Sequence, residues 1–234
     1  MDIKKGIMWL LRGLNKLQFK SLVEETKDNW KKVIKHRFVD QIFAGELAED
    51  IFKFYLKQDY YYLNQSMRNM AILISKLDDV KAKQKLIAVL YSEANLEFSE
   101  YEKMLSLYNI NYKNYNNFEL SYANIAYSNY LIAVSSQNTF AEGLAALIPC
   151  YWLYLKMAEI HADKLKKNQN EIYKNWAAVF KRDEFSQLVE DLIFLLEAEF
   201  REENFELLKY HFNNSIKFEY QFFNDVYHKK IWKI

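Results

Sequence analysis

Thr139–Tyr154 reads TFAEGLAALIPCYWLY, and this stretch opens a long predicted helix. Thr139 and Glu142 form a capping box, in which a hydroxyl group and a carboxylate satisfy free backbone amides at a helix start. The apolar periodicity that follows predicts that the helix continues to about Lys166. One face of it carries Leu147, Cys150, Tyr151 and Tyr154.

The middle of this helix holds the only proline of the chain, Pro149, directly before the only cysteine, Cys150. A proline inside a helix costs about 3 kcal/mol or more and frees the carbonyl group of residue i−4, here Ala145. One interpretation is a kink that suits helix packing, with Cys150 as a small buried hydrophobic residue. The other is a thiol placed for nucleophilic chemistry.

The composition favours an all-helical protein. The 234 residues include four glycines and one proline, whereas ordinary usage would give roughly 16 and 12. Sandwiches, barrels and doubly wound sheets need more turn-forming residues than this. With 51% hydrophobic residues the chain can fill a large core, and its length suits one domain or at most two.

The charge and the cysteine count exclude several classes of protein. A net charge of +1 gives no basis for binding nucleic acid or a membrane surface. One cysteine cannot form an intrachain disulfide framework or a cysteine-based zinc site, so we expect a cytoplasmic protein.

Residues 1–20 contain too short an apolar run for a signal peptide or a membrane span. We expect them to form an N-terminal extension with a short amphipathic helix.

Capping signals and apolar stripes predict seven or more helices. No internal repeat or linker divides the chain, so we expect residues 21–234 to form a single all-helical domain. A capping box at Ser21 and Glu24 starts the first helix of this domain, and Gly45 ends it. Asparagine-rich residues 109–117 predict a loop. The other predicted helices cover about 46–76, 79–107, 118–136, 172–180, 184–200 and 204–227.

Two carboxylates occupy apolar stripes. Asp59 follows Tyr55 and Leu56 at helical spacing, so its side chain is aimed at the core. Glu219 lies at the centre of a stripe with steps of 4, 3, 4 and 3 residues. Burial of a lone ionisable group costs several kcal/mol unless it is paired. These carboxylates could pair with a buried arginine or tyrosine, but with a thiol in the same core they also suit covalent hydrolysis.

Three strings around these residues resemble the TenA/thiaminase II family, which has the haem-oxygenase-like all-α fold. Phe54–Leu63 (FYLKQDYYYL) matches the family pattern Y-x-x-Q-D-x-Y-Y-L, and Phe218–Phe223 (FEYQFF) matches its C-terminal Y-E-Y-Q-F-W. Phe140–Tyr154 matches the helix that contains P-C-Y-W-L-Y. Weaker similarity runs from about Leu22 to Lys229, so the resemblance implies this fold for nearly the whole chain.

The resemblance implies an aminopyrimidine aminohydrolase. Cysteine-type members hydrolyse 4-amino-5-aminomethyl-2-methylpyrimidine to the 5-hydroxymethyl compound plus ammonia in thiamin salvage, and some also cleave thiamin. Cys150 would be the nucleophile that adds to the pyrimidine ring. Asp59 would bind the ring and its amino group, and Glu219 would serve as general acid and then as base. Tyr62 and Tyr127 would line the pocket.

Two positions depart from the family pattern. Phe180, four residues after Trp176, stands where many members have a tyrosine beside the cysteine, and Phe98 stands where members often have a histidine. We therefore expect a less polar pocket, with Phe180 and Tyr154 among the residues that contact the substrate. The nucleophile and both carboxylates are retained.

Alternatives follow from the same residues. A non-catalytic protein that binds aminopyrimidines, or a regulatory one, would keep the pocket without turnover. Haem oxygenases share the fold and bind haem through a histidine of an early helix, here His36, but they need clustered glycines that this chain lacks. No metal or organic cofactor is implied.

Surface aromatic residues and the family resemblance imply a homo-oligomer, with a tetramer as the expected state.

Overall fold

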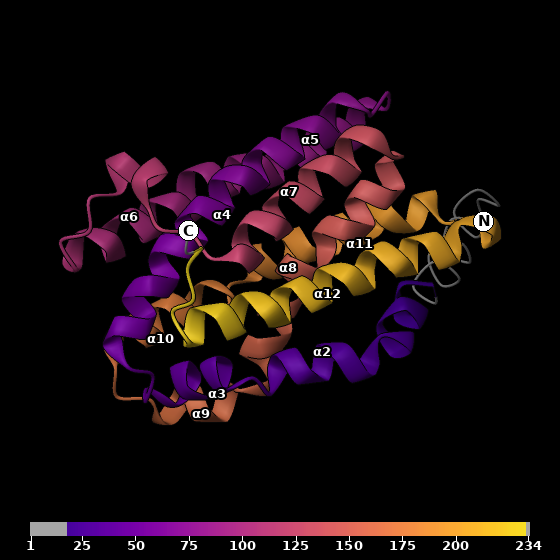
Figure 1. Ribbon diagram of the computed structural model, residues 1–234. Coiled ribbons are helices and arrows are strands. Elements are labelled where there is room, and N and C mark those ends of the chain that lie inside the picture. The colour runs from indigo at the N-terminus through magenta and orange to yellow at the C-terminus, as the bar shows by residue number, and fades with distance from the viewer. Residues whose placement is uncertain (1–17, 233–234) are drawn as a thin grey trace.

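The computed structural model describes residues 18–232, which contain a helical segment over residues 18–25, eleven further α-helices and no β-strand (Figure 1). The fold is therefore all-α, as predicted, with more than seven helices in the described part. None of these helices is long and apolar enough to cross a membrane. The helices are α2 (Lys27–Ile34), α3 (Arg37–Ala44), α4 (Glu49–Ser75), α5 (Val80–Ser92), α6 (Phe98–Leu107), α7 (Tyr122–Gln137), α8 (Phe140–Ile160), α9 (Ala162–Lys167), α10 (Glu171–Val179), α11 (Asp183–Glu199) and α12 (Phe205–Tyr227).

Helix α8 forms the centre of the bundle. Every residue from Ala141 to Tyr154 is buried. Helices α12, α11, α7 and α2 all pack against it, and α4 packs beside α7. In Figure 1, α4, α5 and α7 lie above α8 and α12, and α2 and α3 lie below. The stretch Thr139–Tyr154 therefore supplies the inner layer that the other helices cover.

The capping box at the start of α8 is confirmed. The Thr139 hydroxyl accepts a hydrogen bond from the Glu142 backbone N–H at 3.3 Å. The Glu142 Oε1 atom accepts from the Thr139 backbone N–H at 3.3 Å and from its hydroxyl at 2.8 Å. Because both free amides are satisfied, this end of the helix can be buried in the bundle.

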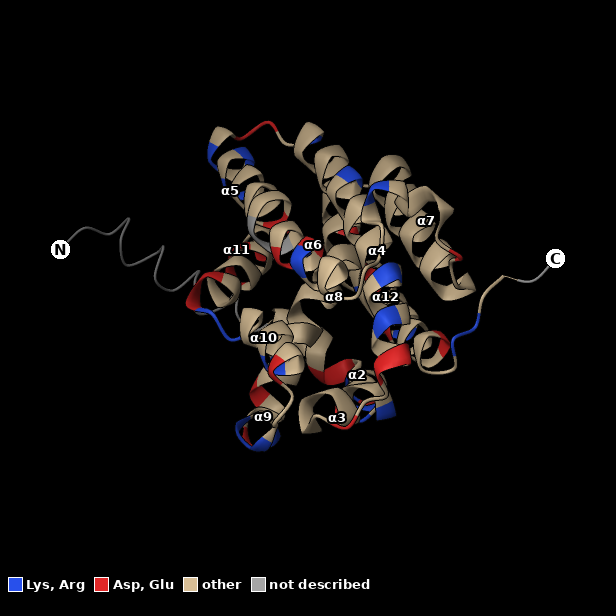
Figure 2. Cartoon of the chain, turned by 90° about the vertical axis from the view of Figure 1, so that its left-hand side faces the viewer, with Lys and Arg blue, Asp and Glu red and all other residues tan. Residues whose placement is uncertain are grey.

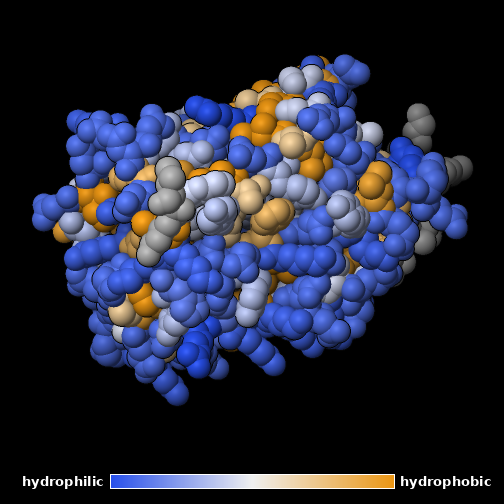
Figure 3. Space-filling model, in the orientation of Figure 1, coloured by the Kyte–Doolittle hydropathy of each residue, from blue (hydrophilic) through white to orange (hydrophobic). Residues whose placement is uncertain are grey.

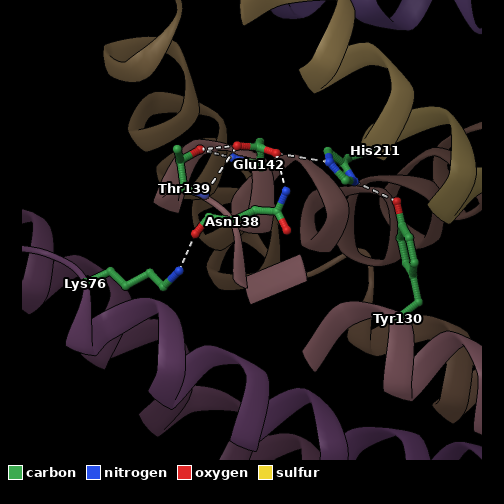
Figure 4. Close-up of polar contacts among 6 residues, drawn as sticks. All are labelled: Lys76, Tyr130, Asn138, Thr139, Glu142 and His211. Carbon is green, nitrogen blue, oxygen red and sulfur yellow. Dashed lines mark hydrogen bonds and ion pairs between the residues drawn. The ribbon is translucent and has the colours of Figure 1, made fainter. Parts of the chain in front are cut away.

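A hydrogen-bond network that begins at the second oxygen of Glu142 connects α8 to α7, α12 and the end of α4 (Figure 4). It accepts a hydrogen bond from the Asn138 amide at 2.6 Å and lies 3.2 Å from His211 Nε2 on α12. The Tyr130 hydroxyl of α7 lies 2.7 Å from His211 Nδ1, and Lys76, after α4, donates to the Asn138 carbonyl. Burial lowers the pKa of His211, although the charge of Glu142 opposes this. A neutral imidazole that donates from Nε2 and accepts at Nδ1 satisfies both contacts.

The predicted helix from Ser21 to about residue 43 is wrong in its bounds. Residues 18–25 are already helical, so Ser21 lies inside a helix instead of capping it. The chain then turns at Thr26, and α3 begins after His36, whose Nδ1 accepts from the Phe38 backbone N–H. Gly45 ends α3 as predicted, with a φ of 84°, a conformation that glycine adopts without strain.

Other predicted boundaries need smaller corrections. The helix predicted over 79–107 contains a π-helix, Glu93–Glu97, between α5 and α6. The helix predicted to reach Lys166 ends at Ile160, and α9 follows. The predicted loop 109–117 contains a short 3-10 helix, Tyr112–Asn117, and α7 starts only at Tyr122, behind the Ser121 cap. The short helix predicted in residues 1–17 lies outside the described residues, so the division at residue 20 stays a prediction.

Three helices approach one another closely at Gly143, and this leaves no room for a side chain there. A methyl group at this position would lie 2.6 Å from Leu73 Cδ2, 2.7 Å from the Ser135 hydroxyl and 3.1 Å from Ser135 Cα. Both neighbours are buried. Helices α4, α7 and α8 therefore meet at a point where no side chain fits.

We predict that Gly143→Ala destabilises the protein. Alanine favours a helix over glycine by about 1 kcal/mol, but overpacking a core typically costs about 1–3 kcal/mol. The melting temperature, measured by circular dichroism, should therefore fall. An unchanged or higher melting temperature would show that Leu73 and Ser135 move aside freely.

Candidate active site

Three helices bring the predicted catalytic residues together. Asp59 on α4, Cys150 on α8 and Glu219 on α12 line two adjoining cavities that share Asp59, Tyr62 and Tyr154. The first cavity is lined by Asp59, Tyr62, Leu63, Ser66, Glu93, Cys150, Tyr151, Tyr154, Phe180 and Phe185. The second is lined by Asp59, Tyr62, Tyr127, Tyr154, Glu219 and Phe222. All seven residues predicted from the sequence thus lie around one site.

The site is narrow and lined largely by aromatic rings. Its two cavities have volumes of about 30 and 10 Å³, which is room for one or two water molecules. The ring of an aminopyrimidine therefore enters only if side chains of the wall move. Phe180 and Phe185 of the first cavity pack against each other, with ring centroids 5.2 Å apart.

Asp59 is held by tyrosine hydroxyl groups. Its Oδ2 atom accepts hydrogen bonds from Tyr55 at 2.8 Å and from Tyr101. The Tyr55 hydroxyl also lies 3.3 Å from that of Tyr154. Burial raises the pKa of Asp59 to about 6, although the two tyrosines favour the ionised form. Asp59 can therefore hold or release a proton close to neutral pH.

Glu219 is 3% exposed and lies among apolar residues. Burial, together with a smaller effect of the Asp59 charge, raises its pKa to about 8. The Tyr127 hydroxyl opposes this shift, although it lies outside normal hydrogen-bond geometry. The raised pKa expected from the apolar stripe is confirmed in direction. At neutral pH Glu219 therefore carries a proton that it can donate.

Cys150 is 7% exposed and lies in the turn of α8 that contains Pro149. Its thiol donates a hydrogen bond to the carbonyl oxygen of Leu147, at 3.1 Å. Burial and the neighbouring thiol raise the pKa of the Tyr62 hydroxyl well above its usual value. The thiol thus lies beside a tyrosine that stays neutral.

Two predicted pocket tyrosines stack on each other. The rings of Tyr62 and Tyr127 lie 5.2 Å apart, and Tyr127 also stacks on Phe218 at 5.3 Å. Both hydroxyl groups are buried, and neither has a hydrogen-bond partner within residues 18–232. Because an unpaired buried hydroxyl is costly, both are available to a polar ligand.

The two departures from the family pattern differ in position. Phe180 lines the first cavity, and its ring lies 4.9 Å from that of Tyr154. Phe98 does not line either cavity and packs on Tyr60 instead, at 5.0 Å. The expectation that Phe98 makes the pocket less polar is therefore wrong. Tyr101, one turn later, brings a hydroxyl group to Asp59.

Sequence reasoning missed several residues of the site: Tyr55, Ser66, Glu93, Tyr101 and Tyr151. Tyr55 could have been found, because it precedes Asp59 by four residues on the same helix face. Glu93 could not, because the π-helix that it begins interrupts the periodicity on which such predictions depend. Tyr101 meets Asp59 only through the packing of α6 on α4.

No histidine of the described residues lines either cavity of this site. His36 caps α3 and its ring packs against Tyr220 and Phe223, at 5.3 and 6.1 Å. Within residues 18–232, no group of three or more His, Cys, Asp or Glu side chains could hold a metal ion.

Comparison with known proteins identifies relatives over nearly the whole chain. An aminopyrimidine aminohydrolase of Halalkalibacterium halodurans is 26% identical over 91% of this chain and 96% of its own length. That of Bacillus subtilis is 29% identical over 87% of this chain and 86% of its own.

Solved structures agree with these relatives. A TenA homologue of P. horikoshii superposes with a TM-score of 0.86 at 30% identity, covering 91% of this chain and 99% of that one. A domain from Shewanella denitrificans, described as having a heme oxygenase-like fold, superposes with a TM-score of 0.73 at 12% identity, over 90% and 92% of the two chains. The bundle therefore has the predicted haem-oxygenase-like fold. Residues 23–229 match the model of the TENA/THI-4/PQQC family, and the chain belongs to this family.

Proposed function

We propose that the chain is an aminopyrimidine aminohydrolase of the thiaminase II type that acts in thiamin salvage. Its substrate would be 4-amino-5-aminomethyl-2-methylpyrimidine, which it would hydrolyse to the 5-hydroxymethyl pyrimidine and ammonia. One observation carries the proposal: a thiol and two buried carboxyl groups with raised pKa values line one narrow site. The names of the relatives point to the same reaction class.

The first half of the reaction expels ammonia. The Cys150 sulfur forms a bond to a ring carbon, and the electrons displaced from that carbon move to a ring nitrogen. The thiol proton passes to Asp59, which lines the same cavity, and Asp59 gives a proton to that ring nitrogen. Those electrons then return and break the bond between the aminomethyl carbon and its nitrogen. Glu219 donates a proton to the departing nitrogen, since burial holds it protonated near neutral pH.

The second half consumes water. Glu219, now ionised, takes a proton from water as its oxygen bonds to the exocyclic carbon. The bond between sulfur and the ring then breaks, and the ring nitrogen returns its proton through Asp59 to the sulfur, which restores the thiol. Tyr62, Tyr127, Tyr154 and Phe180 would contact the ring, and the first three would offer it hydroxyl groups.

Assembly and location are part of the same proposal. Large apolar side chains are exposed on α5 and α11, among them Ile87, Tyr91 and Phe194, at 50%, 67% and 51%. In Figure 3 hydrophobic side chains reach the surface in several patches. Such patches suit contacts between subunits, which supports a homo-oligomer, with a tetramer as the state to test.

Charges of both signs are interspersed over the outer helices (Figure 2), which suits a cytoplasmic protein with a small-molecule substrate.

Cys150→Ser should abolish ammonia release from the aminomethylpyrimidine, because a hydroxyl group is a much weaker nucleophile than a thiol. Fold and ligand binding should be retained. Ammonia release can be followed with a coupled dehydrogenase, and thiamin can be tested as a second substrate. If the wild-type protein binds the pyrimidine but releases no ammonia, the protein is a non-catalytic binder instead.

Glu219→Gln should lower the turnover rate by about 100-fold or more, because the variant keeps size and polarity but cannot exchange a proton. Substrate affinity should change much less. Steady-state kinetics measure both quantities. Turnover close to the wild-type rate would make Glu219 a structural carboxyl group.

The same variant should change how stability depends on pH. The pKa of Glu219 is about 8 in the folded protein against 4.5 for an unperturbed side chain. Its contribution to stability is therefore complete below pH 4.5 and is lost as the pH rises through about 8. Between pH 6 and 9 the wild-type protein should lose stability on the order of a few kcal/mol, and Glu219→Gln should lose less. Thermal unfolding at both pH values tests this, and equal losses would contradict it.

A further inference from the structure

Glu93 is a third carboxyl group in the wall of the site. It is 1% exposed and lines the first cavity together with Cys150 and Asp59. Glu93 begins the π-helix that connects α5 to α6. Single π-turns inside helices are rare and occur often at functional sites, because the additional residue rotates side chains out of the regular helical positions.

One oxygen of Glu93 is anchored and the other is free. Oε2 accepts a hydrogen bond from the Tyr151 hydroxyl at 2.8 Å, and the Ser66 hydroxyl lies 3.5 Å from that of Tyr151. Oε1 is buried and has no hydrogen-bond partner among residues 18–232. Tyr151 and Ser66 line the same cavity. The carboxyl group is therefore held in place with one acceptor available to a ligand.

The surroundings of Glu93 lack a positive charge. Among residues 18–232, no lysine, arginine or histidine lines either cavity. Burial, together with a smaller effect of the Asp59 charge, raises the pKa of Glu93 to about 7, although the Tyr151 and Ser66 hydroxyl groups oppose the shift. An unpaired buried carboxylate is costly, and a cationic ligand would offset that cost. The site therefore favours a ligand that brings a positive charge with it.

Glu93 and Glu219 lie on different sides of the wall that the two cavities share. An alkylammonium group has three N–H bonds, so it can donate to one carboxyl group and keep further N–H bonds for other acceptors of the site. Before the carbon–nitrogen bond breaks, the bound ammonium group gives one proton to the Glu93 carboxylate, and Glu219 then donates to the neutral nitrogen as it departs. Glu93, with an acceptor that no protein group uses, is suited to binding.

We propose that Glu93 binds the positively charged aminomethyl group of the substrate and makes the site prefer this amine over its alcohol product. The identity of the ligand rests on the proposed function. The hydroxymethyl product has the same ring but no ammonium group, so it gains nothing from the carboxylate and leaves readily. Glu93 would thus bind substrate and promote product release.

Binding is measured in the Cys150→Ser background, where no turnover occurs, by isothermal titration with the aminomethyl and the hydroxymethyl pyrimidine at pH 7.5. Glu93→Gln keeps the size of the side chain and an acceptor for Tyr151, but removes the charge. Affinity for the amine should fall about tenfold or more, and affinity for the alcohol by less than about threefold. Equal losses for both ligands, or an unchanged affinity for the amine, would overturn the proposal.

Glu197→Gln is the matched control. Glu197 is also buried, with a pKa raised to about 7, but it accepts from the Phe19 backbone N–H at 2.7 Å and lines neither cavity. Both affinities should stay unchanged in this variant.

Tyr151→Phe gives a second test if Glu93→Gln does not fold. Without its anchor Glu93 is less well placed, so the ratio of amine to alcohol affinity should again fall, whereas an unchanged ratio would overturn the proposal. Failure of the proposed function looks different. The wild-type protein would then release no ammonia, while selective binding of the amine would still depend on Glu93.

Discussion

The burial of α8 on every side is the constraint on which the rest of the structure depends. A helix that exposes almost none of its residues from Ala141 to Tyr154 must be covered by several others, and α2, α7, α11 and α12 cover it. Its first turn is buried too, so the capping box and the contact of Glu142 with His211 are needed to satisfy polar groups there. The same burial places Cys150 where only groups on the covering helices can reach it.

The site is assembled at the expense of stability. Asp59, Glu93 and Glu219 are all buried, and burial raises the pKa of each. Tyrosine hydroxyls stabilise Asp59 and Glu93, but among residues 18–232 no cation lines the cavities. A purely structural core would be more stable with apolar side chains at such positions. Proton exchange near neutral pH is the property that these carboxyl groups gain from burial.

Aromatic packing and hydroxyl chemistry are combined in the same side chains. Tyr55 packs its ring against Phe38 and Trp176 while its hydroxyl binds Asp59. Tyr62 and Tyr127 stack on each other while their hydroxyl groups remain unpaired within the described residues. Tyrosine suits this position because its ring fills the core and its hydroxyl group supplies a neutral donor. The high tyrosine content of the chain therefore serves both the core and the site.

The sequence by itself determined the helical class, the cap of α8, the end of α3 at Gly45 and the inward direction of Asp59 and Glu219. These features depend on residues within a few turns of one helix, where backbone geometry dictates which side chains share a face. The tertiary structure alone decided that residues 18–44 form more than one helix, that Tyr101 reaches Asp59, and that Glu93 enters the site. Each of these depends on how helices pack or on a π-turn that breaks the 3.6-residue period. Periodicity records which way a side chain faces along its own helix, but the partner that it meets is set by the distance and register between helices.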